Sequence, residues 1–445
     1  MKKFRFLFFL YYYPPVPGTA ARRNFSISSF INHLVSSSYI FTSSKVPSVK
    51  PSEEHVTIET LPTFDYRYFL RRLTKDGALP EHKKESGSAQ FMIRLINSFP
   101  INVIAGEGGL IYFINAIRKG GKIIRNEKIT HLYSSYRPFT DHYAAYWLKR
   151  QHPELIWIAD FRDLIIDPHY NHLLFPERHH ALYKKIFCKA DFLTTVSEGL
   201  ALHLRNYNPS VLTLRNGIQD NFVIPKPIHT SLFSIVYTGS MFLDKRNAEP
   251  LFQALKELIE EGKVERPELQ ILYAGKDSLP WHQLASKYYF ESQFSDSGII
   301  SREAAADMQM KACINVLLTI SSETLQGVLT GKMIEYIEVG SPVLAIIVNQ
   351  NDPELQYILQ ELEIGNSFSD QPLDLVGIKD FILTEYLKWK ATGMNSKPVN
   401  TEVVKQKYTQ ESTMKPLLEA LSVLPLNPTS APLSTSPKGD LSLKE

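Results

Sequence analysis

A glutamate at the start of a short helical stretch has the clearest chemical use in this chain. Glu335 lies in the stretch 331–342, where apolar residues recur at helical spacing before a glycine and a proline end the helix. The β-branched run 343–348 is typical of a parallel strand buried on both faces. Open α/β sheets bind ligands where such loops and helix starts meet. Glu335 could therefore accept the two hydroxyls of a ribose diol, or it could simply face the helix dipole.

A second cluster of charged side chains ends the expected strand 156–160. Asp160 and Asp163 flank Arg162 in the run Asp-Phe-Arg-Asp. Two carboxylates beside an arginine suit a hydroxyl and a phosphate that share one binding site. They suit a self-satisfied cluster of ion pairs equally well. The residues alone leave both interpretations open.

Basic and glycine residues follow two other expected strands. Lys245 and Arg246 come shortly after the strand 233–239, and such a pair suits phosphate oxygens or an exposed helix start. Near the N-terminus, the expected strand 4–13 runs into a Pro/Gly loop that ends at Gly18. A glycine lets the backbone approach a phosphate or a sugar without a Cβ in the way.

Taken in order, these motifs resemble the glycosyltransferases of family 4, which have the GT-B fold. The donor-domain signature of that family has two glutamates ahead of a short helix and a Gly-x-Pro ending. Glu335 falls on the second glutamate, and 340–342 matches the ending. The position of the first glutamate holds Gly327, which departs from the pattern. Many members from bacterial surface-polysaccharide pathways carry an Asp-Phe-Arg-Asp run like the one at 160–163.

The resemblance assigns roles residue by residue. It implies that the nucleotide-sugar donor is bound by Gly18, Thr19, Gly239, Ser240, Lys245, Arg246, Lys332 and Glu335. It implies that the acceptor hydroxyl faces Asp160, Arg162 and Asp163, as the catalytic group. No metal and no cofactor are expected beyond the nucleotide diphospho-sugar, which is a co-substrate. The adjacent histidines His179 and His180 point to different faces of a helix and are not a metal pair.

The implied activity is retaining transfer of a sugar from a nucleotide diphospho-sugar to a hydroxyl acceptor in polysaccharide or glycolipid synthesis. A lipid-linked acceptor is the habit of the family in such pathways. Two alternatives stay open. One is a nucleotide-sugar 2-epimerase of the same fold, which would need more acid/base groups than the motifs supply. The other is a non-catalytic nucleotide-binding relative, which is suggested by Gly327 at the position of the first motif glutamate.

Alternating strands and helices in both halves predict the elements that position these residues. The expected fold is α/β, with two doubly wound Rossmann-like domains that face a central cleft. The expected divisions are an acceptor-side domain 1–217 with an irregular insertion 45–90, a nucleotide-sugar-binding domain 218–400, a helix 401–425 that crosses back to the first domain, and a disordered tail 426–445. A helix 111–125 is expected to be interrupted at Gly120-Gly121, and the signals fade past Asp370.

Composition limits the class of protein. The 445 residues carry 49 Lys and Arg against 46 Asp and Glu, a net charge of +3, which gives no reason to expect nucleic acid as a partner. The two cysteines, Cys188 and Cys313, indicate a reducing compartment, and no apolar run of membrane-spanning length occurs. We therefore expect a cytoplasmic protein. Its basic, aromatic N-terminal segment either contacts the inner face of the membrane or consists of solvated strand flanks. A buried strand at 4–13 explains this segment better than a signal peptide.

Overall fold

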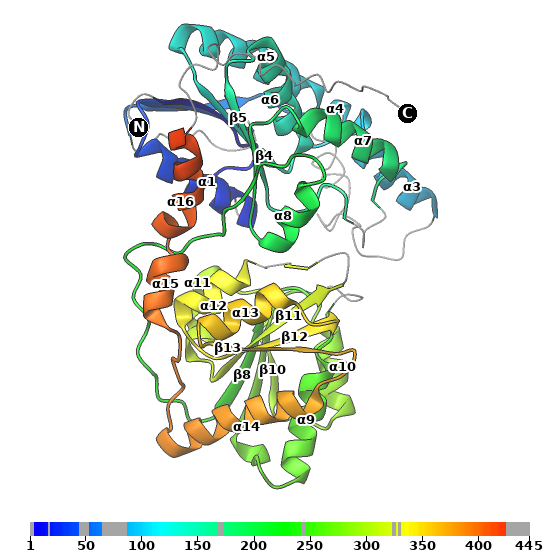
Figure 1. The fold of residues 1–445 in the computed structure, drawn as a ribbon. Helices are drawn as coiled ribbons and strands as arrows, with labels where there is room; N and C mark the ends of the chain where they lie inside the picture. Colours follow the sequence, from blue (N-terminus) through cyan, green and yellow to red (C-terminus); the bar gives the residue numbers. More distant parts are fainter. Residues whose placement is uncertain are drawn as a thin grey trace, which may run out of the picture.

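A computed structural model describes residues 4–16, 18–43, 53–64, 87–167, 172–241, 246–322, 326–327 and 331–423. Within these ranges the strands form two separate parallel sheets, and helices cover both faces of each sheet (Figure 1). The first half of the chain builds the upper domain of Figure 1, and the second half builds the lower one. The predicted fold of two doubly wound Rossmann-like domains is confirmed.

Among the described residues, the N-terminal sheet has the order β3-β2-β1-β4-β5-β6-β7. Its strands are β1 (Arg5–Phe9), β2 (Ser37–Ser43), β3 (Val56–Leu61), β4 (His131–Tyr136), β5 (Ile156–Phe161), β6 (Phe192–Thr195) and β7 (Val211–Thr213). β1 pairs with both β2 and β4, so the predicted buried strand near the N-terminus is central in the sheet. The strand order reverses between β1 and β4, and such a switch point is where open α/β sheets bind ligands.

The C-terminal sheet has the order β10-β9-β8-β11-β12-β13 in the described part of the chain. Its strands are β8 (Phe233–Thr238), β9 (Leu269–Ala274), β10 (Phe294–Asp296), β11 (Ile314–Ser321), β12 (Val343–Asn349) and β13 (Gly365–Ser369). Its switch point lies between β8 and β11. The loops that leave these two strands lead to residues 239–246 and to the stretch 331–342, where the sequence places its donor residues.

Helices connect the strands and cover the sheets. Those of the first domain are α1 (Thr19–Asn32), α3 (Gly87–Asn97), α4 (Ile101–Ile104), α5 (Gly109–Glu127), α6 (Phe139–Gln151), α7 (Pro176–Phe187) and α8 (Glu198–Leu204). Those that follow are α9 (Glu249–Glu260), the 3-10 turn η1 (Arg266–Glu268), α10 (Leu279–Lys287), α11 (Arg302–Lys311), α12 (Lys332–Val339), α13 (Pro353–Glu361), α14 (Leu375–Thr392), α15 (Thr401–Lys407) and α16 (Gln410–Val423). Among the described residues, no helix is both long and apolar enough to cross a membrane.

Side chains of each central strand alternate between two apolar layers, as the pleat requires. On β1, Leu7 and Phe9 pack with α5, α6 and α7, whereas Phe6 and Phe8 pack with α1 and α16. The second sheet is covered in the same way, by α9, α10 and α14 on one face and by α12, α13 and α15 on the other. Because both faces are buried, the carboxyl ends of the strands are where polar residues can gather.

The last two helices connect the C-terminal half back to the first domain. α15 packs in the core of the second domain, and α16 lies beside α1, as the left side of Figure 1 shows. Met414, Leu417 and Leu421 of α16 are buried in the apolar layer that includes Phe6 and Phe8. The expected single helix over 401–425 is thus two helices, which separate at Tyr408 and Thr409. The expected tail 426–445 lies outside the described residues.

Two other expectations about elements were wrong, and one stretch without a clear signal is helical. The segment 45–90 contains β3, an edge strand parallel to β2, and the start of α3, although 44–52 and 65–86 lie outside the described residues. Gly120 and Gly121 lie within α5 without interrupting it, because a Cβ at Gly120 would come within 2.8 Å of Leu148 on α6, where the two helices pack closely. Past Asp370 the chain forms the long helix α14.

Candidate active site

The switch points of the two sheets lie against each other. Gly18 caps the N-terminus of α1, and Thr19 begins it. A Cβ at Gly331, the N-cap of α12, would lie 3.1 Å from Cγ2 of Thr19. One turn into α1, Nη1 of Arg22 lies 3.4 Å from Oε1 of Glu335. The structure therefore brings together Gly18, Thr19 and Glu335, which the sequence places in different domains.

Glu335 presents a partly exposed carboxylate in the first turn of α12. Besides Arg22, Nε of Arg302 lies 3.9 Å from Oε1. On the other oxygen, Nε2 of Gln309 lies 3.5 Å away, and the same nitrogen donates to Oγ1 of Thr238 at 2.7 Å. The carboxylate therefore lies beside two guanidinium groups and one amide.

Lys332, three residues before Glu335, has a buried amine. Its Nζ lies 4.0 Å from the centroid of the Tyr237 ring. Within the part of the chain that the structure describes, no hydrogen-bond acceptor pairs with this nitrogen. Burial, together with repulsion from Arg246, lowers the pKa of Lys332 to about 7. A buried lysine without an acceptor is a group poised for an anionic ligand.

The loop after β8 meets this amine. Gly239 has φ +127°, which favours glycine, and a Cβ there would lie 2.3 Å from Nζ of Lys332. Arg246 donates from Nη1 to the hydroxyl of Tyr237 at 2.9 Å and also to the carbonyl of Ser240. Gly239, Ser240, Arg246 and Lys332 thus surround one tyrosine. Lys245, the remaining predicted donor residue, lies outside the described residues.

Asp160 does not face an acceptor in this structure. It is fully buried, and its oxygens accept from Nε and Nη2 of Arg23 at 2.9 and 2.6 Å and from Oγ1 of Thr194 at 2.7 Å. Arg23 also donates to the carbonyl of Leu214 at 2.9 Å, so this pair ties α1 to the chain that leaves the first domain. The expectation that Asp160 contacts the acceptor was wrong, because the side chain points into the core under α1.

The other two residues of that run remain near the surface. The side chain of Asp163 is 61% exposed, and its Oδ2 lies 3.7 Å from Nε of Arg162. Arg162 also donates to the carbonyl of Tyr136 at 3.2 Å. A small cavity of about 50 Å³ lies beside this loop, at the carboxyl ends of β4 and β5. Its walls include Asn97, Tyr136, Arg137, Ile165 and His172.

Sequence reasoning missed residues that support the site from outside the motifs. Arg22 and Arg23 lie about one helical turn after the Pro/Gly loop. Such a pair of arginines could have indicated residues that support an anionic site. Gln309 holds both Thr238 and Glu335, but an isolated glutamine on α11 carries no recognisable pattern. Among the described residues no group of three histidine, cysteine or acidic side chains could hold a metal ion.

Solved structures of glycosyltransferases share this architecture. A sucrose-phosphate synthase from Thermosynechococcus elongatus superposes with a TM-score of 0.59 at 14% identity, over 94% of this chain and 99% of that one. WaaG, a glycosyltransferase involved in lipopolysaccharide biosynthesis, gives 0.53 at 13% identity, over 92% and 98%. The fold is GT-B. A TarM variant from S. aureus, in complex with fondaparinux, α-GlcNAc-glycerol and UDP, gives 0.55 at 12% identity, over 94% and 99%.

Sequence comparison adds no family to this likeness. No protein-family model matches the chain, and no curated protein matches it. At 12–14% identity, the solved structures establish the GT-B fold.

Proposed function

We propose that this protein is a glycosyltransferase that moves a sugar from a nucleotide diphospho-sugar to a hydroxyl acceptor with retention of anomeric configuration. The observation that carries the proposal is the buried amine of Lys332, which has no hydrogen-bond partner among the described residues and lies at the switch point of the second sheet, next to Arg246 and Glu335. Phosphate needs such cations, and a ribose diol needs such a carboxylate. The combination supports the family 4-like assignment that the sequence suggests.

In this proposal the residues around Tyr237 bind the diphosphate. Lys332 supplies a point charge, Arg246 supplies a fork of donors, and Gly239 lets the backbone approach the phosphates. When the bond between the anomeric carbon and the diphosphate oxygen breaks, negative charge grows on that oxygen. Cations fixed in place stabilise the charge without reorganising. The acceptor oxygen bonds to the anomeric carbon, and its proton is taken up by the leaving diphosphate.

The acceptor is proposed to approach from the first domain, along the loop that leaves β5. Arg162 and Asp163 remain the candidates to contact it, since Asp160 is committed to Arg23. The cavity beside Tyr136 and His172 has room for a hydroxyl or a small polar group. Polysaccharide or glycolipid synthesis is the context we infer, and the likeness to WaaG and TarM supports it.

The first test is calorimetric titration of UDP, GDP and ADP into the wild type and into Glu335→Ala. We expect one nucleotide to bind, and the substitution to weaken it about 10- to 100-fold, because a bidentate grip on the ribose is lost. Titrations in EDTA should match those without it, since Lys332 and Arg246 supply the positive charge. Glu338→Ala is the control, as Glu338 lies in the same helix but outside the proposed ribose contact. Failure of every nucleotide to bind would refute the donor site.

A nucleotide-binding protein without transfer activity is the second candidate, because Gly327 occupies the position of the motif's first glutamate. Release of sugar or a transfer product from the bound nucleotide-sugar would exclude it. Turnover to an epimeric nucleotide-sugar would instead indicate the 2-epimerase.

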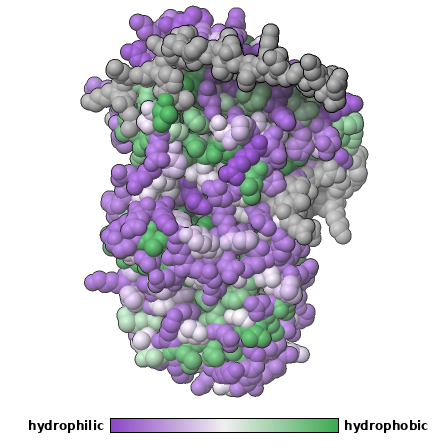
Figure 2. Space-filling view, in the orientation of Figure 1, coloured by the Kyte–Doolittle hydropathy of each residue, from purple (hydrophilic) through white to green (hydrophobic). Residues whose placement is uncertain are grey.

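We further propose that the protein contacts an anionic membrane surface through α3, α4 and α5, which would bring a lipid-linked acceptor to the site. The N-terminal segment cannot supply this contact through its aromatic residues, because Phe6, Phe8 and Phe9 are fully buried in β1. The adjacent helices expose the large apolar side chains Phe91, Met92, Ile104, Leu110, Ile111 and Ile114. Exposed basic residues follow along α5, namely Arg118, Lys122 and Arg125. Figure 2 shows mainly hydrophilic residues where the domains meet on the face shown.

Cosedimentation with vesicles tests the membrane contact. We expect binding to vesicles of phosphatidylglycerol and little to vesicles of phosphatidylcholine, since each basic residue near an anionic surface contributes about 1 kcal/mol. Ile111→Asp with Ile114→Asp should weaken binding about tenfold or more. The matched control is Leu279→Asp, which changes a similarly exposed leucine on α10 of the other domain. Equal binding by both variants would contradict the proposal.

A further inference from the structure

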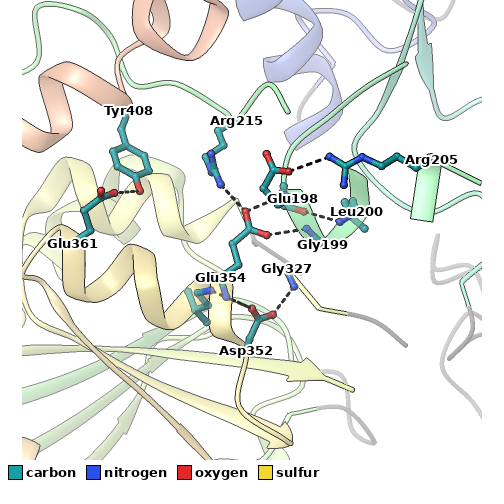
Figure 3. A network of polar contacts seen from close by, with 12 residues as sticks. Glu198, Gly199, Leu200, Arg205, Arg215, Gly327, Asp352, Glu354, Glu361 and Tyr408 are labelled. Atoms are coloured by element: carbon teal, nitrogen blue, oxygen red, sulfur yellow. Dashed lines mark hydrogen bonds and ion pairs between the residues drawn. The ribbon is translucent and has the colours of Figure 1, made fainter. Parts of the chain in front are cut away.

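A carboxylate of the second domain is bound by the first domain at their junction. Oε1 and Oε2 of Glu354, in the first turn of α13, accept from the backbone N–H groups of Glu198 and Gly199 at 3.0 and 2.9 Å. Oε1 also accepts from Nη2 of Arg215 at 2.7 Å. The side chain of Glu354 is only 11% exposed, so water competes little for these bonds. Figure 3 shows the three contacts converging on this one side chain.

Two glycines make this approach sterically feasible. A Cβ at Gly199 would lie 2.0 Å from the carbonyl oxygen of Gln326. A Cβ at Gly327 would lie 2.4 Å from Oε2 of Glu354 and 2.9 Å from the backbone nitrogen of Gly199. Gly327 also has φ +68°, a conformation that favours glycine. The backbones of the two domains therefore touch at a pair of positions that admit no side chain.

Asp352 holds the second-domain half of this contact. It caps α13 by accepting from the backbone N–H groups of Glu354 and Leu355, both at 3.1 Å. Its other oxygen accepts from the backbone N–H of Gly327 at 2.7 Å. Asp352 is 1% exposed, and burial raises its pKa. The glycine and the glutamate are thus fixed relative to each other by contacts within the second domain.

We propose that Glu354 is a positioning residue that holds the two domains in the arrangement in which Thr19 and Arg22 lie against the first turn of α12. In this arrangement, the contact between the domains requires glycine at position 327. The Glu354 carboxylate occupies the space that a side chain at this position would need. The departure from the family signature is then a feature of the interface and no sign of lost activity. Only the kinetic part of this inference rests on the proposed function.

The domain arrangement can be measured without any assumption about the reaction. Cys188 is an exposed, free cysteine of the first domain, Cys313 is buried, and Val376 on α14 is 71% exposed. Spin labels on Cys188 and on the cysteine of Val376→Cys therefore report one distance between the two domains, measured by double electron–electron resonance. In this labelled background we expect a single narrow distance distribution. Glu354→Ala and Gly327→Ala should each broaden it and shift it to longer distances.

Glu361→Ala is the matched control. This glutamate lies on the same helix, but it accepts from Lys407, the last residue of α15, and from Tyr408, the next residue, rather than from α8. Figure 3 shows its contact with Tyr408. It should leave the distribution unchanged. Gly327→Ala removes no charge, so it keeps the test decisive if Glu354→Ala does not fold. Distributions identical to the wild type for both Glu354→Ala and Gly327→Ala would overturn the inference.

Kinetics give a second measurement where transfer is detected. Glu354→Ala should raise KM for the nucleotide-sugar about tenfold and lower kcat as well, since the three contacts of its carboxylate with the first domain are lost. Arg215→Ala should do the same to a smaller extent. If the wild type binds no nucleotide, the proposed function fails while the distance measurement still decides the role of Glu354. Unchanged KM and kcat in Glu354→Ala would count against the inference.

Discussion

Replacing Lys332 with methionine is expected to lower kcat/KM about 100- to 1,000-fold, the range found when one preorganised charged donor is removed from a transition state. Methionine keeps the length of the side chain and fills the space over Tyr237, so the fold should be kept. The end of the Lys332 side chain already lies against Gly239, where a Cβ would be 2.3 Å from Nζ. A residue of the same length is therefore the suitable replacement. Lys311→Met is the control, because Lys311 is exposed on α11 and pairs with Asp307.

The same lysine predicts how nucleotide binding depends on pH. Burial and the nearby Arg246 lower the pKa of Lys332 to about 7, so the free protein at pH 8 holds mostly the neutral amine. A diphosphate favours the charged amine and raises its pKa. Binding above pH 7 therefore takes up a proton, and affinity falls as pH rises, by at most about tenfold for each pH unit. Below pH 7 the amine is already charged, and the dependence disappears.

Proton uptake can be measured directly. Calorimetric titration at pH 8 in buffers of different ionisation enthalpy should give an uptake approaching one proton for the wild type and none for Lys332→Met. At pH 6 the uptake due to Lys332 should vanish. A wild type that takes up no proton at pH 8, while it binds nucleotide well, would show that Lys332 does not face the diphosphate.

Replacing Asp160 with alanine is expected to destabilise the protein by about 3–5 kcal/mol, because it leaves the guanidinium of Arg23 buried without its charge partner. Both side chains are almost completely buried, and the pair is bidentate. Because Arg23 also bonds the carbonyl of Leu214 and Oδ1 of Asn216, the loss reaches the chain that leaves the first domain. Thermal or denaturant unfolding measures the change.

Asp163→Ala is the matched control for Asp160→Ala, since both aspartates belong to the run 160–163 and the sequence pattern predicts the same role for each. Asp163 is largely exposed, so its removal should cost less than about 1 kcal/mol. Changing both partners, as Arg23→Met with Asp160→Leu, should recover much of the stability lost in the single variant. If Asp160→Ala and Asp163→Ala unfold together, Asp160 is not the structural residue that the geometry indicates.

The fold class and the location of the candidate site could be read from the sequence for a simple physical reason. Parallel strands buried on both faces need near-continuous apolar runs, as at 343–348, so the polar residues of the chain collect at strand ends. Gly18, Gly239 and Glu335 each follow such a run. The edge strand β3 was missed because polar residues interrupt it, so it lacks the continuous apolar run of a strand buried on both faces.

Which charged residue faces the ligand was decided by packing. Asp160 lies two residues from Ile158 on β5, so the pleat directs both side chains toward the apolar layer under α1. Arg23 of α1 binds the Asp160 carboxylate there. Arg22 and Arg23 are consecutive on α1 and therefore point about 100° apart, one to the second domain and one to the core.

The sequence by itself determined the two doubly wound domains and the loops where ligands can bind, since these follow from local apolar periodicity. Only the tertiary structure decided that Asp160 is a core residue, that the amine of Lys332 is buried beside Gly239, and that Glu354 meets the backbone of α8. These three outcomes depend on contacts between segments far apart in the chain, which local patterns do not encode.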